Sequence, residues 1–551
     1  MASAPEGTDP RQNPPETGGD LVERGQRLSN SILWRLMREF YDQVGVEAWA
    51  TGVVPHMVTS GPRLAWSASR VLLGYLRDLC RAQDELPTRE APVLSLGDPL
   101  YVVELGSGTG RFAFNFLQAL EGLREAEPFR RVKVCCVMTD FTRRNLEFWQ
   151  EHPRLQPWLD SGALDFAILD AERDREIRLE RSGLVLDART LKNPLVVLAN
   201  YVFDTLRADA FQVRQGRLLE SAVRVRADSP GWHLTDPFQR LARLRVDYEP
   251  REAREDYYDS ADWNRVLGEY RQTLDDTGVS IPVGAFRCLD NLLEVSGGRA
   301  LVLATDKAWN RLENFRNLSD PQPQIHGSFS LSVNFHALGR LFEIRGGLAL
   351  HSGLRDGWLD HVALLADPRL DHTSELEMSF REVMSESMPI DFWRLKQALD
   401  PSLPGKPLHL ALELLRLSRW DPDVFYMLRD DIAEGLPSAD LAVRAEFAVA
   451  LEQVWANYYH YHRDQNVVFE IARAYQCMSC SQEALGFYEA SLSLYGETPP
   501  THYNMGLLHD ERGNPEAALE SFGRALAQDP DYPEAASRIE RIRAEGGPDP
   551  G

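Results

Sequence analysis

The sequence has few cysteines and no long apolar run. Its 551 residues include only six cysteines, which are too few and too irregularly spaced for a disulfide framework, so a reducing compartment fits best. No stretch of about 18 consecutive apolar residues is present, which argues against a membrane span. The N-terminal segment also lacks the apolar core of a secretory signal. We therefore expect a soluble, cytoplasmic protein with no membrane partner.

Positive charge is scarce as well. The chain has 60 Lys and Arg residues against 83 Asp and Glu residues, for a net charge of −23. A strongly acidic surface repels nucleic acid and anionic membranes, so neither is expected as a general partner. Hydrophobic residues make up 43% of the chain, which is enough for a sizeable core and excludes global disorder. The length predicts about three domains.

Local composition divides the chain into segments. Residues 1–28, rich in Pro, Gly and Glu, are predicted to form a disordered tail. Residues 29–95 have apolar residues at helical spacing and are expected to cover the next domain. Within residues 96–371 buried strands alternate with helices, which predicts a parallel sheet with helices on both faces. Alternation around a turn between Phe211 and Tyr248 predicts an antiparallel β-hairpin insertion. Residues 372–465 are expected to be a helical linker region.

The C-terminal region, residues 466–551, is predicted to consist of helical repeats and a capping helix. The sequence there repeats with a period of 34 residues, in a register that pairs Ala484 with Ala518 and Tyr488 with Phe522. This is the period of the tetratricopeptide repeat (TPR). Because stacked repeats present a concave surface that suits an extended peptide, a protein or peptide partner is expected.

The stretch ELGSGTG, from Glu104 to Gly110, points to a ligand. It lies between a predicted strand and a predicted helix, where backbone N–H groups and the positive helix end can face a bound group. Glycines at Gly106, Gly108 and Gly110 allow close approach to the backbone. A dinucleotide-binding loop would have a further glycine where Arg111 stands, which disfavours a nicotinamide-dependent oxidoreductase. The alternative is a strand-to-helix turn that merely needs glycine.

This spacing, with an acid two residues before the first glycine, resembles motif I of class I S-adenosylmethionine (SAM) dependent methyltransferases. The resemblance implies a Rossmann-like class I methyltransferase fold and SAM as the cofactor. It assigns the loop, with Glu104 and Ser107, to the cationic methionine part of SAM. It further implies Asp140, after the second strand, for the ribose and Asp170, after the third strand, for the adenine. For either aspartate alone, a capping or turn role is the alternative.

A second segment, Ala199–Phe211, resembles the NEFFDALP segment of the MidA family, which includes a mitochondrial complex I assembly factor. The matching residues are Asn200, Phe203, Asp204 and Leu206. The resemblance implies methylation of protein arginine and adds Asn200 to the cofactor site. The segment HGSFSLSVNFHAL also resembles a later stretch of that family.

The departures from the family pattern concern the acceptor. The family's glutamate, proline, acid, histidine and second acid are replaced by Tyr201, Arg207, Ser328, Ser332 and Asn334. An arginine nucleophile needs carboxylates to orient its guanidinium, so these replacements argue against arginine and leave SAM binding untouched.

Two residues after the fourth strand are the catalytic candidates. Asp204 could orient the acceptor or act as general base, with a helix-start acid as its alternative. Tyr201 could close the pocket or bind the acceptor, with a core or lid tyrosine as its alternative. No metal site is expected, because the Cys477–Cys480 pair has no second pair to complete a ligand set.

Two functions are compatible with these features. The first is a SAM-dependent methyltransferase that acts on a protein or peptide recruited by the TPR tail. The second is a non-catalytic scaffold or assembly factor that keeps the methyltransferase fold and binds its partner through the repeats.

Overall fold

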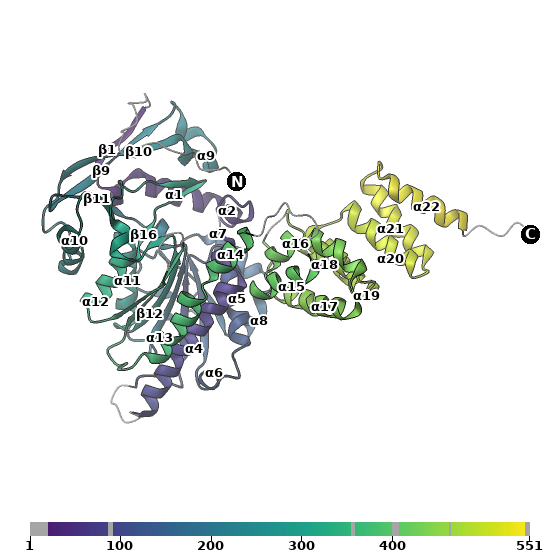
Figure 1. Cartoon of the computed structure of the whole chain (residues 1–551), viewed down its shortest axis with the longest axis horizontal. Helices are drawn as coiled ribbons and strands as arrows, with labels where there is room; N and C mark the ends of the chain where they lie inside the picture. Colours follow the sequence, from purple (N-terminus) through teal and green to yellow (C-terminus); the bar gives the residue numbers. More distant parts are fainter. Residues whose placement is uncertain are drawn as a thin grey trace, which may run out of the picture. The chain divides into compact units, whose positions relative to one another are not determined.

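A computed structural model describes residues 20–54, 56–85, 92–353, 359–398, 407–461 and 464–545. The chain divides into two compact units, one that extends to Asp391 and one that starts at Phe392 (Figure 1). The division lies beyond residue 371, the expected end of the α/β domain. The reason is that α13 (Ser374–Phe380) packs on α4 (Pro62–Glu85), where the buried Asp78 carboxylate accepts hydrogen bonds from the first backbone N–H groups of α13.

The first unit is built on a seven-stranded sheet with the order β17-β18-β12-β7-β2-β3-β4. The five strands β12, β7, β2, β3 and β4 are parallel. At the edge of the sheet β18 runs antiparallel to β12, and β17 runs antiparallel to β18. The strands are β2 (Leu100–Leu105), β3 (Val134–Asp140), β4 (Leu164–Ile168), β7 (Leu195–Asn200), β12 (Ala300–Asp306), β17 (Leu348–His351) and β18 (Asp360–Ala366). Near-continuous runs of Val, Leu and Ala form the parallel strands because both of their faces are buried. The predicted fold class is confirmed.

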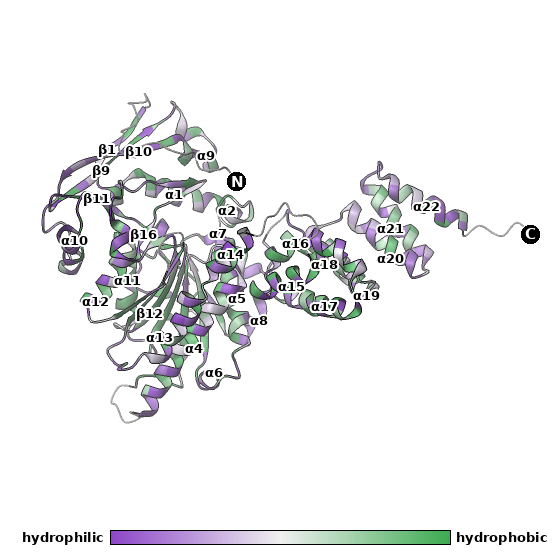
Figure 2. Cartoon of the chain, viewed as in Figure 1, coloured by the Kyte–Doolittle hydropathy of each residue, from purple (hydrophilic) through white to green (hydrophobic). Residues whose placement is uncertain are grey.

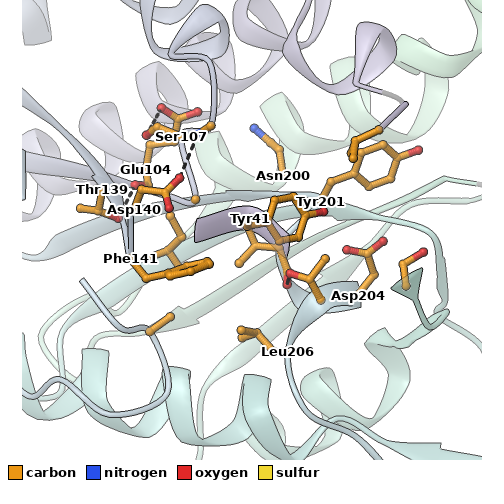
Figure 3. Close-up of a pocket in the computed structure, with 18 of the residues that line it drawn as sticks. Tyr41, Glu104, Ser107, Thr139, Asp140, Phe141, Asn200, Tyr201, Asp204 and Leu206 are labelled. Atoms are coloured by element: carbon orange, nitrogen blue, oxygen red, sulfur yellow. Dashed lines mark hydrogen bonds between the residues drawn. The ribbon is translucent and has the colours of Figure 1, made fainter. Parts of the chain in front are cut away.

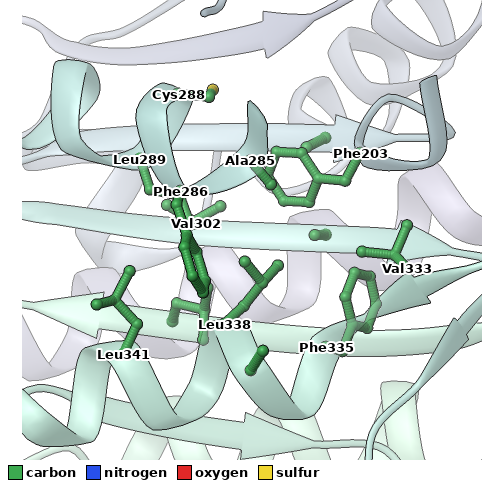
Figure 4. Packing of buried hydrophobic residues seen from close by; sticks show 14 of the residues in the cluster. Phe203, Ala285, Phe286, Cys288, Leu289, Val302, Val333, Phe335, Leu338 and Leu341 are labelled. Carbon is green, nitrogen blue, oxygen red and sulfur yellow. The ribbon is translucent and has the colours of Figure 1, made fainter. Parts of the chain in front are cut away.

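Helices cover this sheet. The buried core beside β12 includes Phe286 and Leu289 of α11 (Val283–Val295) and Leu338 of α12 (Phe335–Ile344), which surround Val302 (Figure 4). Helix α4 packs against α5 (Arg111–Glu121), which follows the glycine-rich stretch. Buried hydrophobic residues follow the central strands, whereas the helices carry hydrophilic residues as well (Figure 2).

The strand order reverses between β2 and β7. From β2 the chain adds β3 and then β4 on one side, whereas β7 is followed by β12 on the other side. At such a switch point the connections leave toward opposite faces of the sheet, so a crevice opens at the carboxyl ends of the strands. Glu104 and Asn200 lie at these two carboxyl ends.

A second, five-stranded sheet replaces the simple hairpin. The predicted hairpin is β8 (Asp209–Arg214) and β9 (Arg217–Ala227), and β9 also pairs with β10 (Leu244–Glu252) and with β1 (Asp20–Gln26). The fifth strand, β11 (Thr277–Ile281), pairs with β8. The prediction of a disordered tail is therefore wrong for residues 20–26, and its first 19 residues lie outside the described part of the chain.

This smaller sheet supports α1 (Ile32–Val44). Leu33, Trp34 and Phe40 of α1 share one buried cluster with Val223 and Val225 of β9. The apolar face of α1 is thereby held over the carboxyl ends of the large sheet.

The described residues from 407 onward form helices joined by short loops, with no strand among them. The helices are α15 (Leu408–Leu417), α16 (Pro422–Gly435), α17 (Leu441–Ala456), α18 (Val467–Cys477), α19 (Ser481–Tyr495), α20 (Pro499–Glu511), α21 (Pro515–Gln528) and α22 (Pro533–Glu545). The aligned repeat residues Ala484, Ala518, Tyr488 and Phe522 are all fully buried. A Cβ atom on Gly506 would lie 2.6 Å from the Phe522 ring, so the helix pair needs a glycine there. None of the described helices has the length and apolarity that a membrane crossing requires.

Candidate cofactor and acceptor site

A pocket opens at the carboxyl ends of β2, β3, β4 and β7. It encloses about 1440 Å³ of empty space when its open mouth is included. All the residues predicted for the site line it except Gly110. Glu104, Ser107 and Asp140 lie toward one end, Tyr201 and Asp204 lie toward the other, and Tyr41 lies between them (Figure 3).

The glycine-rich loop needs its glycines for conformation. Gly106, Gly108 and Gly110 have φ values of 58°, 53° and 83°, in the left-handed region that other residues rarely adopt. A Cβ atom on Gly108 would lie 3.1 Å from the Trp49 indole. Gly110 is the N-cap residue of α5 and does not line the pocket. Its role is therefore to start the helix.

Glu104 is buried at the base of this loop. Its carboxylate accepts a hydrogen bond of 2.7 Å from Ser107 Oγ, and its backbone carbonyl accepts one of 2.7 Å from Thr139 Oγ1. Burial raises the pKa of Glu104 to about 8, the Ser107 hydrogen bond opposes the rise, and the nearby Asp140 adds to it. The position therefore favours a cationic ligand, which would return Glu104 to its charged form.

Asp140 holds the loop against β3. Its carboxylate accepts hydrogen bonds from Asn145 Nδ2 at 2.8 Å, from the Thr142 backbone N–H at 3.1 Å and from the Gly108 backbone N–H at 3.3 Å. Burial raises its pKa in spite of these donors. The side chain therefore positions Gly108 as well as lining the pocket.

Asp170 lies beyond the end of β4, where its carboxylate forms an ion pair of 3.1 Å with Arg38. The same carboxylate accepts a hydrogen bond of 3.1 Å from the Glu172 backbone N–H, so it also organises its own turn. Phe141 and Leu169 line the pocket beside it. Apolar side chains therefore lie beside the Asp170 carboxylate in this part of the pocket.

Asp204 lies at the end of the pocket opposite Glu104, and it is 5% exposed. Its Oδ1 atom is buried and finds no hydrogen-bond partner among the described residues. Burial raises its pKa to about 7, against the lowering effect of Lys307 and the Ser330 hydroxyl. The turn Phe203–Thr205 is a single three-residue 3-10 turn, and so short a helix has little of the dipole that a helix-start acid would use.

Backbone hydrogen bonds fix the turn that carries Asp204. Its backbone N–H donates to Asp306 Oδ2 at 3.1 Å, and its carbonyl accepts from the Leu331 N–H at 3.0 Å. Tyr201 has φ of 52°, an uncommon conformation for a residue with a side chain. The N–H of Tyr201 donates to the Thr305 carbonyl at 2.9 Å. Asn200 also lines the pocket, and its Nδ2 is buried without a partner in the described part of the chain.

Sequence reasoning missed several lining residues. Trp34, Tyr41 and Trp49 come from the N-terminal helices, Lys307 directly follows β12, and Ser330 ends the short strand β15 (Ser328–Ser330). Two of the residues that differ from the MidA pattern lie in the interior: the Asn334 side chain is the N-cap of α12, and Ser328 is fully buried. No group of His, Cys, Asp and Glu suited to a metal ion occurs among the described residues.

Comparisons with known proteins agree in part with this picture. Residues 499–532 match the tetratricopeptide repeat model, which confirms the second predicted repeat. A search of curated proteins finds no match to the chain.

Three solved structures from Burkholderia thailandensis are similar to the chain. An uncharacterized COG1565 superfamily protein has 12% identity and a TM-score of 0.37, over 62% of this chain and 89% of that one. A COG1565 superfamily member bound to S-adenosyl-homocysteine has 14% identity and a TM-score of 0.34, over 63% and 95%. An O-methyltransferase family protein has 9% identity and a TM-score of 0.22, over 52% and 57%.

Proposed function

We propose that the protein is a SAM-dependent methyltransferase whose TPR tail recruits a protein or peptide acceptor. The observation that carries the proposal is the pocket at the strand-order reversal. There Gly106 and Gly108 line the pocket, and Glu104, Asp140 and Asp170 lie at or just beyond the ends of three neighbouring strands. Glycine-rich backbone at such a switch point is a common cradle for nucleotide-like ligands.

The residues present fit SAM. A Cβ atom on Gly108 would lie 3.1 Å from the Trp49 indole, so glycine lets the loop backbone lie close to this aromatic wall of the pocket. Glu104 suits the cationic methionine part, Asp140 the ribose, and Asp170 with Phe141 the base. When bound, SAM supplies a methyl group already activated by its sulfonium charge. The protein then has to hold the acceptor in line, which is mainly a task of positioning.

Asp204 is the residue proposed to orient the acceptor or remove its proton. Asp204 lines the pocket, its buried Oδ1 atom has no hydrogen-bond partner among the described residues, and its backbone is fixed at both the N–H and the carbonyl. Because its pKa is raised to about 7, the carboxyl can exchange a proton near neutral pH, as a general base must.

The affinity for SAM is expected to rise with pH. Below about pH 8 the Glu104 carboxyl is protonated in the free protein, so a cation loses its partner and binds more weakly. We expect a gain of up to about tenfold per pH unit, levelling off above pH 8. Calorimetric titration at several pH values measures this, with Glu104→Gln as the control that should flatten the dependence. An affinity that stays constant between about pH 6 and 9 would contradict the role of Glu104.

Recruitment by the repeats gives a second test. With labelled SAM in a cell lysate, we expect the label in a protein or peptide. Shortening the chain after residue 498 removes the last repeat and its cap, and it should reduce this labelling at least about tenfold. S-adenosylhomocysteine (SAH) affinity should stay unchanged, which controls for the folding of the first unit. Label found only in small molecules would count against a protein acceptor. Full labelling by the shortened chain would count against recruitment.

A further inference from the structure

One wall of the pocket is contributed by α1. Its residues Trp34, Met37, Arg38 and Tyr41 all line the pocket, and their spacing of three and four places them on one face of the helix. Three of them are apolar or aromatic and mostly buried, whereas Arg38 is a cation on the same face. A cation on a mostly buried apolar face is stabilised when an anionic or aromatic side chain lies next to it.

The partners of Arg38 lie on the large sheet. Its guanidinium is 3.1 Å from Asp170, beyond the end of β4, and its Cζ atom lies 4.4 Å from the centre of the Phe141 ring, beyond the end of β3. Arg38 thus occupies the position beside Asp170 and Phe141 to which the proposed function assigns the nucleoside base.

The contact is suited to opening. The two side chains of the ion pair are 39% and 16% exposed, and pairs with this much solvent access are weak. Helix α1 ends at Gly45, which has φ of 58°, and Gly52 follows with φ of 71°. The apolar residues of α1 pack in the buried cluster of the smaller sheet, whereas toward the helix after β3 the helix accepts a hydrogen bond from Arg144 at the Gln43 carbonyl.

We infer that α1 is a movable wall of the nucleoside subsite and that Arg38 is its latch, closing onto Asp170 and Phe141 between rounds of ligand exchange. This inference rests on the proposed function for the identity of the ligand. A planar base can reach Asp170 only when the guanidinium has moved aside, and the guanidinium can close again over the bound base. Arg38 is therefore a positioning residue that sets the exchange rate.

Stopped-flow binding of SAH tests the latch. In Arg38→Ala we expect association and dissociation each to become about fivefold faster or more, with Kd changed by less than about threefold. The matched control is Arg35→Ala on the same helix. Arg35 is 68% exposed, and among the described residues its ion pair is with Glu39 of the same helix, at 3.7 Å, so the rates of Arg35→Ala should equal those of the wild type. Wild-type rates in Arg38→Ala would overturn the inference.

Hydrogen exchange of the free protein provides a readout that needs no ligand. Amides of residues 33–44 should exchange faster in Arg38→Ala than in Arg35→Ala, because losing the latch frees the wall. Equal exchange in the two variants would overturn the latch. If the wild type binds no SAH, the proposed function fails, and the exchange comparison still decides whether Arg38 holds α1 in place.

Discussion

Replacing Gly108 with valine is expected to lower the affinity for SAM and SAH by about 100-fold or more. The residue has φ of 53° and faces Trp49 so closely that a Cβ atom would lie 3.1 Å from its indole. A branched side chain must therefore shift the loop, the Trp49 ring or both, and these are the groups that would cradle the ligand. Calorimetric titration of the purified protein measures the loss.

The control for this variant is Gly162→Val. Gly162 also has a positive φ, of 72°, but nothing lies within 4 Å of its added Cβ atom. Both variants should lose about 1–2 kcal/mol of stability from the backbone strain. Only Gly108→Val should lose binding. If Gly108→Val binds SAH as tightly as Gly162→Val does, the glycine loop is a structural turn and the cofactor assignment is wrong.

Replacing Asp204 with asparagine is expected to slow methyl transfer by about 100-fold to 10,000-fold, the usual contribution of a general base. Its pKa of about 7 sets the pH dependence. The active form is the carboxylate, so the wild-type rate should rise about tenfold per unit below pH 7 and level off above it. A side-chain amide cannot titrate in this range, so the Asp204→Asn variant should lose that rise. Transfer of label from SAM to the acceptor measures both effects.

Binding separates this catalytic role from a structural one. Asp204 lies at the opposite end of the pocket from Glu104 and Ser107 (Figure 3), so SAH affinity in Asp204→Asn should remain within about threefold of the wild type. A variant that binds SAH normally and transfers methyl groups at the wild-type rate would exclude Asp204 as base. If the protein acts as a scaffold, SAH affinity is likewise unchanged, but no transfer is detected in the wild type either.

Most of the fold could be predicted because its requirements are local. Runs such as Val102–Leu105 are buried on both faces, and the 34-residue register of the repeats depends on small and aromatic residues within each helix pair. Strand β1 could not be predicted. Its residues are largely polar and half exposed, and they become a strand only by pairing with β9, about 200 residues later in the sequence.

The site could be predicted in part for the same reason. Gly106 and Gly108 have backbone conformations that favour glycine, so their positions can be recognised from the sequence. Gly110 belongs to the same glycine pattern, but it serves as the N-cap of α5. Lys307 and Ser330 reach Asp204 only through tertiary folding, and no local pattern points to them. The sequence shows Arg38 as a cation on an otherwise apolar helix face. It does not show the partner of Arg38, because Asp170 lies 132 residues away.

Titration of the unmodified full chain with SAM, and separately with SAH, tests the assignment of the pocket most directly. The pocket described here predicts saturable binding of both ligands at one site per chain. The heat of binding should be absent when the Gly108→Val variant is titrated. No detectable binding of either ligand at high concentration would contradict it. The first unit would then be a scaffold, and the helical repeats would be the functional part of the protein.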